Sequence, residues 1–275
     1  WRFNPKNLVI LHGSKLINAT VLGIKSSRTT VGHRFESKNK VIELVHANDY
    51  ADKLLKEGSV IASFEKRKGA IKNSISIATQ ALKKNVLAIN DDSLLEEVTA
   101  LVEMPNILIG KFESKYLDVP QECLILTMKS NQKYFPIVDN KNKLTNQFII
   151  VSNLTPANPK KIIEGNEKVI RPRLADAEFF FKQDKKNTLL EMSNKLDKII
   201  YHNKLGSQSD RAKRVSKIHR HIYQELSIGD FKDFERVALL AKADLVCLMV
   251  GEFPELQGIM GRYYALNSNE DISIA

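Results

Sequence analysis

The feature that most constrains the fold of this chain is a change of hydrophobic pattern at TPANPKK (155–161). Before this segment, short β-rich runs alternate with stretches of helical spacing, whereas after it the apolar residues recur only at helical spacing. A Pro-rich turn of this kind suits a hinge. We therefore predict an α+β protein, with a mixed α/β domain over 1–160 followed by an all-α domain over 161–275.

The expected elements follow from local patterns. Helices are expected where apolar stripes meet helix start or stop signals, and strands where β-branched runs are bounded by Gly or polar residues. In the first domain we expect helices at 48–58, 64–85 and 91–103, and strands at 7–13, 18–24, 106–112, 122–130, 134–139 and 147–153. In the second we expect helices at 160–182, 185–203, 208–226, 233–250 and 254–266.

Composition narrows the class of protein. The apolar content of 43% is that of a folded chain, and the net charge of +10 suggests an acidic partner such as nucleic acid. The most apolar stretch (237–250) is too short to cross a bilayer and carries Lys242 and Asp244, so no membrane association is expected. The two cysteines cannot form a Cys-rich zinc site or a disulfide framework, so we expect a cytoplasmic protein. The first residue, Trp1, and the last, Ala275, suggest a piece of a longer protein.

Catalytic motifs are not found in the sequence. It has no GxxxxGK[ST], GxGxxG or GxSxG segment, and HGSK (12–15) resembles a nucleotidylyl-transferase motif only loosely. TVGHRF (30–35) is more distinctive, because Arg34 could grip a phosphate. For His33 a structural role is the favoured interpretation.

Positive charge concentrates between residues 202 and 221. The basic side chains there are opposed by Asp210 alone, and they are Lys204, Arg211, Lys213, Arg214, Lys217 and Arg220. Lys213, Lys217 and Arg220 recur at helical spacing, which places them on one face. Such a face suits a phosphate backbone, although an ordinary solvated face has the same pattern.

A second basic motif lies in GNEKVIRPRLADAEFFFKQD (165–184). Arg171 and Arg173 flank Pro172, so a stiffened turn could present two guanidinium groups in a fixed geometry. Asp176 and Glu178 follow closely, which leaves open a purely structural ion-pair cluster.

His219, His221 and Asp244 raise the question of a metal site. Phosphohydrolases of the HD type use an adjacent His-Asp pair, but here Ala243 precedes Asp244. Two histidines two residues apart also point to different sides of a helix. We therefore expect no catalytic metal and no catalytic residue in this chain.

Several long segments closely resemble the β subunit of bacterial heterotetrameric glycyl-tRNA synthetase. They cover nearly the whole chain in the expected order and are WRFNPK (1–6), ATVLGIKSSR (19–28), GHRF (32–35), SLLEEVTALVE (93–103), TMKSNQKYFPI (127–137), GNEKVIRPRLADAEFFFKQD (165–184), KLGSQSDRAKRV (204–215) and AKADLVCLMVGEFPELQGIMGRYYA (241–265). The family's β subunit is longer, so the chain resembles an internal fragment without the anticodon-binding part.

The resemblance implies a division of labour between subunits. The α subunit of an α2β2 heterotetramer would carry the class II core that activates glycine with ATP and Mg, while this chain would bind no cofactor and hold the glycine tRNA. The first domain would be similar to the editing-type domain of phenylalanyl-tRNA synthetase, and the second to a degenerate HD domain. An editing deacylase, a residual HD phosphohydrolase and a scaffold for the α subunit remain alternatives.

The candidate tRNA-binding residues come from the basic segments. In the helical half they are Arg171, Arg173, Arg211, Lys213, Arg214 and Lys217, and the alternative surface in the α/β half has Arg28, Arg34 and Lys133.

Overall fold

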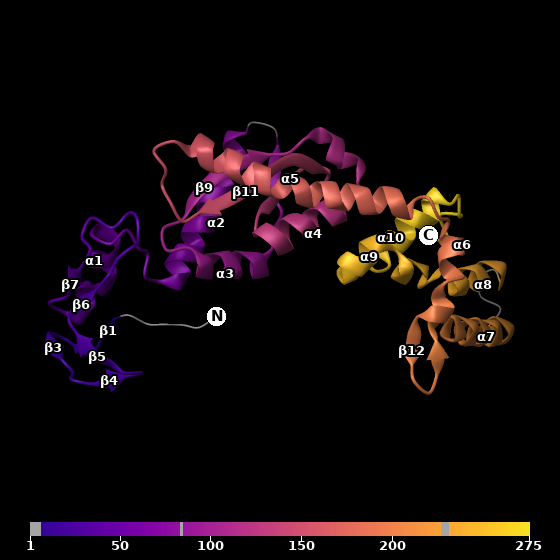
Figure 1. Ribbon diagram of the computed structural model, residues 1–275, viewed down its shortest axis with the longest axis horizontal. Coiled ribbons are helices and arrows are strands. Elements are labelled where there is room, and N and C mark those ends of the chain that lie inside the picture. Colours follow the sequence, from indigo (N-terminus) through magenta and orange to yellow (C-terminus); the bar gives the residue numbers. More distant parts are fainter. Residues whose placement is uncertain (1–6, 83–84, 227–230) are drawn as a thin grey trace. The chain divides into compact units, whose positions relative to one another are not determined.

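The computed structural model describes residues 7–82, 85–226 and 231–275 (Figure 1). The segment WRFNPK (1–6), which contributes to the resemblance, lies outside these described residues. The chain divides into two compact units, one formed by Trp1–Phe112 and Gln132–Lys168 and the other by Glu113–Asn131 and Val169–Ala275. The described residues form a mixture of helices and small sheets, so the predicted α+β class is confirmed.

The main sheet of the first unit is antiparallel, with strand order β8-β10-β11-β9. Its strands are β8 (Val86–Ala88), β9 (Asn106–Lys111), β10 (Phe135–Asp139) and β11 (Leu144–Ser152). Helices α2 (Phe64–Ala81) and α3 (Asp92–Leu101) pack against it around a core that includes Ile71, Leu95, Val98, Ile137 and Ile149.

Local signals explain why α2 and α3 begin where they do. The hydroxyl of Ser63 accepts a hydrogen bond from the amide of Lys66, and the carboxylate of Asp91 accepts one from the amide of Leu94. Both side chains satisfy amides that have no partner in the first helical turn. The helices predicted at 64–85 and 91–103 are thus confirmed over Phe64–Ala81 and Asp92–Leu101, while residues 83–84 lie outside the described residues.

The rest of the first unit is built from short elements. They are β1 (Leu8–Val9), β2 (Leu11–His12), β3 (Lys15–Leu16), β4 (Thr20–Val21), β5 (Ile24–Ser27), β6 (Thr29–Thr30), β7 (Ile42–Glu43), η1 (Ala47–Asp49) and α1 (Tyr50–Lys56). His33 is buried here, and its Nδ1 accepts hydrogen bonds from the amides of Phe35 and Glu36. The favoured structural role of His33 is therefore confirmed.

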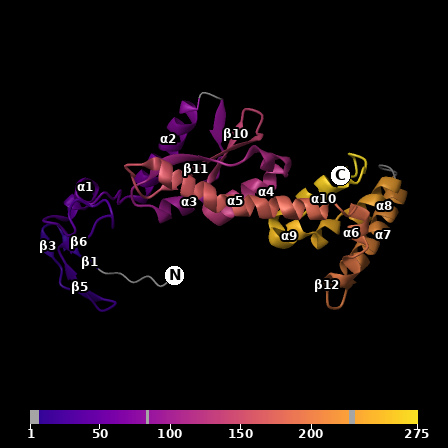
Figure 2. The same cartoon turned by 45° about the horizontal axis from the view of Figure 1, so that its top comes forward.

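The second unit is mainly helical, as Figure 2 shows from a second direction. Its elements are η2 (Ser114–Asp118), α4 (Gln121–Gln132), α5 (Pro159–Asp184, which begins in the first unit), α6 (Leu189–Ser193), η3 (Leu196–Lys198), β12 (Ile200–His202), β13 (Gly206–Ser207), α7 (Gln208–Leu226), α8 (Phe231–Leu240), η4 (Ala243–Val246), α9 (Leu248–Glu252), η5 (Pro254–Leu256) and α10 (Ile259–Asn267). Helices α7 and α8 lie side by side in both views.

Two buried carboxylates hold the second half of this unit together. Asp184 accepts hydrogen bonds from the amides of Leu248 and Met249 and from the hydroxyl of Tyr264. Asp244 accepts hydrogen bonds from the amides of Gly258 and Gly261, at 2.5 and 3.0 Å. Each carboxylate therefore satisfies the free amides at the start of a helix, α9 or α10.

Both cysteines are buried in the second unit. The thiol of Cys123 contacts the sulfur of Met260 at 3.4 Å, and the sulfur of Cys247 accepts a hydrogen bond from the amide of Val250. Burial raises the pKa of each thiol to about 12. At neutral pH both side chains are therefore protonated thiols.

Four sequence predictions are wrong. The helix expected at 254–266 is divided into η5 and α10, because Gly258 between them adopts a φ of +83°. Residues 122–130 form helix α4 and not a strand, because Cys123, Leu124, Thr127 and Met128 are buried at helical spacing in a run too short to separate the two periods. Of the helix expected at 185–203 only Leu189–Ser193 is α-helical, and residues 200–207 form a hairpin that the all-α prediction excluded. The helix expected at 233–250 is divided into α8, η4 and α9, since Asp184 captures the amides that start α9.

Candidate nucleic-acid interface

Helix α7, which carries most of the predicted tRNA-binding residues, starts from a reciprocal cap. The hydroxyl of Ser207 accepts a hydrogen bond from the amide of Asp210, whose carboxylate accepts one from the amide of Ser207 at 2.9 Å. These hydrogen bonds from Ser207 lower the pKa of Asp210 below its ordinary value. Asp210, the one acidic residue of this basic segment, therefore caps the N-terminus of α7.

The basic face predicted for α7 is present. Lys213 and Lys217 are exposed and one helical turn apart. The ammonium group of Lys213 lies 3.9 Å from Asp210, and Lys217 makes no ion pair with any residue that the structure describes. Arg220, on the same face, is paired with Glu235 of α8 at 2.6 Å. On this face, the positive charges of Lys213 and Lys217 are therefore the ones that carboxylates compensate least.

The other two predicted arginines of α7 already have partners in the hairpin. The guanidinium group of Arg211 lies over the ring of Tyr201, 4.7 Å from its centroid, and Nη1 of Arg214 donates to the carbonyl of Leu205 at 2.9 Å. These contacts join β12 and the hairpin turn to the first turns of α7. A cation–π contact and a neutral acceptor leave the positive charge of both groups uncompensated.

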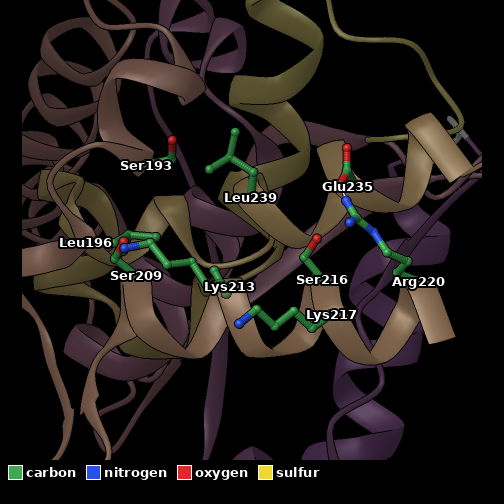
Figure 3. Close-up of a pocket in the computed structure, with 10 residues that line it drawn as sticks. Ser193, Leu196, Ser209, Lys213, Ser216, Lys217, Arg220, Glu235 and Leu239 are labelled. Atoms are coloured by element: carbon green, nitrogen blue, oxygen red, sulfur yellow. Dashed lines mark hydrogen bonds and ion pairs between the residues drawn. The ribbon is translucent and has the colours of Figure 1, made fainter.

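A groove lies beside this basic face, between α7 and α8 (Figure 3). Its volume is about 410 Å³, and the side chains that line it come from α7, α8 and the end of α6 with η3. They are Ser193, Leu196, Ser209, Ala212, Lys213, Ser216, Lys217, Arg220, Glu235 and Leu239. The groove exists because α7 presents small side chains, Ala212 and Ser216, toward α8.

The second basic motif differs from its prediction. Pro172 lies inside the continuous helix α5, so Arg171 and Arg173 do not sit on a turn and project from different sides of the helix. Nε of Arg171 pairs with Glu113 at 2.5 Å, whereas Glu178 pairs with Lys182. The ion pair of Arg171 is therefore made with Glu113 and not with Asp176 or Glu178, the partners that the sequence left open, and Arg173 is exposed without an ion pair to a described residue.

The three candidates of the first unit are scattered. Arg28 donates to the carbonyls of Val45 and Ser14, and Lys133 pairs with Glu97 at 2.9 Å. Arg34 is exposed and lies over the ring of Phe35, 5.3 Å from its centroid. The structure does not show these cations as one patch.

The residues that suggested a metal have separate surroundings. Asp244 is bonded to helix amides, His221 is exposed, and the ring of His219 lies 5.3 Å from that of Phe234. Within the described part of the chain, no group of three or more His, Cys, Asp or Glu side chains could hold a metal ion. Burial raises the pKa of Asp244 above its ordinary value, while the amides of Gly258 and Gly261 act in the opposite direction.

Comparison with known proteins identifies the family. The sequence profile of the glycyl-tRNA synthetase beta subunit matches residues 5–275. The chain belongs to this family. It is 52% identical to the glycine–tRNA ligase beta subunit of Delftia acidovorans, over 98% of the chain and 38% of the relative. The corresponding proteins of Polaromonas naphthalenivorans and Neisseria meningitidis serogroup C are 53% and 52% identical, over the same shares.

The chain spans somewhat more than a third of the length of these beta subunits. Within its described residues, no helix is both long enough and apolar enough to cross a membrane.

The sequence reasoning missed two features of the site in this family member. One is the hairpin, whose signal was the β-rich run Ile200–His202 followed by a turn ending in Gly206, which adopts a φ of +83°. The other is the groove, whose signal was the placing of Ser209, Ala212 and Ser216 at helical spacing beside the lysines. Neither signal specifies a partner helix, so the groove needed the structure.

Proposed function

We propose that this chain is the tRNA-binding part of the beta subunit of a glycine–tRNA ligase. In this proposal the alpha subunit attaches glycine to its tRNA with ATP and Mg in a cytoplasmic α2β2 assembly, and this chain holds the tRNA without a catalytic residue or a cofactor of its own. The family membership supports the assignment to the ligase. We further propose that the first unit contains an editing-type domain and that the helical unit is a degenerate HD domain.

The observation that carries tRNA binding is the exposed face of α7, where Lys213 and Lys217 stand with little or no compensation from carboxylates. Arg214 adds charge next to this face, whereas Arg211 lies two positions before Lys213 and adds charge on another side of the helix; the hairpin holds both side chains. Cations held on a rigid helix can follow a phosphate backbone. We include Arg173 and Arg34 as secondary contacts, because both are exposed.

The HD phosphohydrolase alternative has less support than tRNA binding. An HD phosphohydrolase would use Asp244 as a metal ligand, but this carboxylate is buried and accepts hydrogen bonds from Gly258 and Gly261. A scaffold for the alpha subunit would need no uncompensated cations on α7, so the same experiment separates it from tRNA binding.

The test is the affinity of the complete ligase for its tRNA as a function of salt concentration. Replacing Lys213 and Lys217 with alanine removes up to two phosphate contacts, and each should lower the slope of log affinity against log salt by about 0.7–0.9. Lys38→Ala with Lys40→Ala is the control, because these lysines are exposed and lie in the other unit. Unchanged affinity and slope in the α7 variant would exclude this face.

A further inference from the structure

We propose that the groove between α7 and α8 receives one unpaired nucleotide of the tRNA, with its base on the apolar floor of the groove and its phosphate at Lys213 and Lys217. This inference rests on the proposed function and deepens it, since it assigns a distinct role to the recess beside the basic face.

The charges of the lining favour an anion with one or two negative charges. Arg220 and Glu235 compensate each other across the groove at 2.6 Å. The surplus is therefore the two ammonium groups of Lys213 and Lys217, of which only the first has a carboxylate nearby, at 3.9 Å. Ammonium groups on flexible stems suit a phosphate that is partly exposed to solvent.

The floor of the groove is apolar and its wall carries free hydroxyls. Leu239 is 40% exposed and lines the groove with Ala212, above the buried Leu196, which gives an apolar surface for the flat face of a base. The hydroxyls of Ser209 and Ser216 bond to no other described residue, unlike that of Ser193, which donates to the carbonyl of Leu190 at 2.7 Å. A hydroxyl can both donate and accept, so these two can bond a base edge or a ribose 2′-hydroxyl.

The size of the recess selects an unpaired nucleotide over a duplex. A volume of about 410 Å³ is that of a small-molecule site. A paired base is stacked inside a helix, and a duplex would offer this face only its backbone, so the recess would stay empty. A free base can leave the stack and enter it.

The test uses the complete ligase and a single-stranded RNA pentanucleotide that carries a photoreactive uridine. We expect crosslinks to peptides of α7 and α8, found by mass spectrometry and competed by unlabelled pentanucleotide. Ser216→Leu fills the groove without changing charge and should lower this crosslink about tenfold, the scale of losing one base contact. Gln224→Leu is the matched control, because this position is exposed on the same helix and does not line the groove.

A blunt RNA duplex separates this inference from the proposed function. Ser216→Leu should leave duplex binding unchanged, while Lys213→Ala with Lys217→Ala weakens both RNAs. Unchanged crosslinking in Ser216→Leu together with weaker binding in the lysine variant would overturn the groove and keep the basic face. No effect of the lysine variant would overturn both. Ser209→Leu, at the other end of the groove, repeats the test if Ser216→Leu lowers the melting temperature.

Discussion

At the scale of single residues, Asp244 shows how a buried carboxylate can hold the start of a helix. Both of its helix contacts are made by one oxygen, Oδ2, which lies against Gly261 so closely that a Cβ there would be 3.2 Å away. The side chain, the two glycine amides and the start of α10 therefore form one interlocked contact. Loss of this acceptor should therefore weaken the protection of the two glycine amides against hydrogen exchange.

We expect Asp244→Ala to destabilise the start of α10 by about 1–3 kcal/mol, because the amides of Gly258 and Gly261 lose their buried acceptor. Asp244→Asn keeps an oxygen at the same place and should cost much less. Hydrogen exchange of residues 258–267 measures the effect. Equal protection in the wild type and the alanine variant would contradict the structural role of this carboxylate.

The contributions of Asp244 and Asp210 to folding stability should depend on pH with opposite signs. Burial raises the pKa of Asp244, so the folded state holds this proton more tightly, and stability is lost as pH rises from the ordinary Asp range through the raised pKa. Hydrogen bonds from Ser207 lower the pKa of Asp210, so its contribution is present above the ordinary range and lost as pH falls through the lowered pKa.

The measurement compares each wild-type segment with its Asp→Asn variant across acidic pH, by hydrogen exchange corrected for the intrinsic rate. Protection of 258–267 relative to Asp244→Asn should decrease with rising pH, and protection of 208–214 relative to Asp210→Asn should increase. The same sign in both segments would show that at least one of the pKa shifts is wrong.

At the scale of elements, the hairpin β12–β13 holds the start of α7. Gly206 adopts a φ of +83°, and a Cβ at this position would lie within 2.4 Å of the Asp210 carboxylate. We expect Gly206→Ala to destabilise the first turn of α7 by about 1–2 kcal/mol from the backbone conformation alone. Increased hydrogen exchange of residues 208–214 would record it.

Gly165→Ala is the matched control for this substitution. Gly165 lies in α5 with a negative φ, and a Cβ there would meet no atom within 4 Å. The same change should therefore stabilise α5 by up to about 1 kcal/mol. If both variants behaved alike, the left-handed conformation of Gly206 would not be what holds the cap.

The elements also show how far sequence patterns reach. Helices α2 and α3 could be predicted because a capping side chain, Ser63 or Asp91, stands just before a long apolar stripe. Helix α4 could not, because its apolar run fits both periods and its helical state is settled by packing, for example of Cys123 on Met260. The division between α8 and α9 depends on Asp184, a contact 64 residues away.

The candidate site has the same limit. Sequence supplied the cations and the face that Lys213 and Lys217 share on α7. The sequence could not show that Arg171 forms an ion pair with Glu113, 58 residues away, or that Arg28 donates a hydrogen bond to the carbonyl of Val45. Whether a basic residue is free to bind an anion is decided by tertiary contacts, which a local pattern does not encode.

At the scale of the whole molecule, the net charge of +10 on this chain should attract RNA at long range and so speed its association. At low ionic strength, removing any two exposed lysines lowers this long-range attraction to a similar extent. We expect Lys38→Ala with Lys40→Ala to slow tRNA association slightly and leave dissociation unchanged. Lys213→Ala with Lys217→Ala should slow association to the same extent and also speed dissociation, because it removes contacts in the complex.

Stopped-flow association and dissociation of labelled tRNA with the complete ligase distinguish the two effects. Equal dissociation rates for the two double variants would mean that the lysines of α7 act only through net charge. The charge change is the same in both variants, and the comparison is made at low ionic strength, where screening of the more distant lysines is weakest.

The burial of Cys123 and Cys247 has a practical consequence for labelling. Maleimides react with exposed thiolates, and both native thiols are enclosed and hold their protons up to a pKa of about 12. A cysteine introduced at an exposed position such as Gln224 would then be the reactive one within this chain. A fluorophore or spin label can therefore be attached beside the groove while both native sulfurs stay in place.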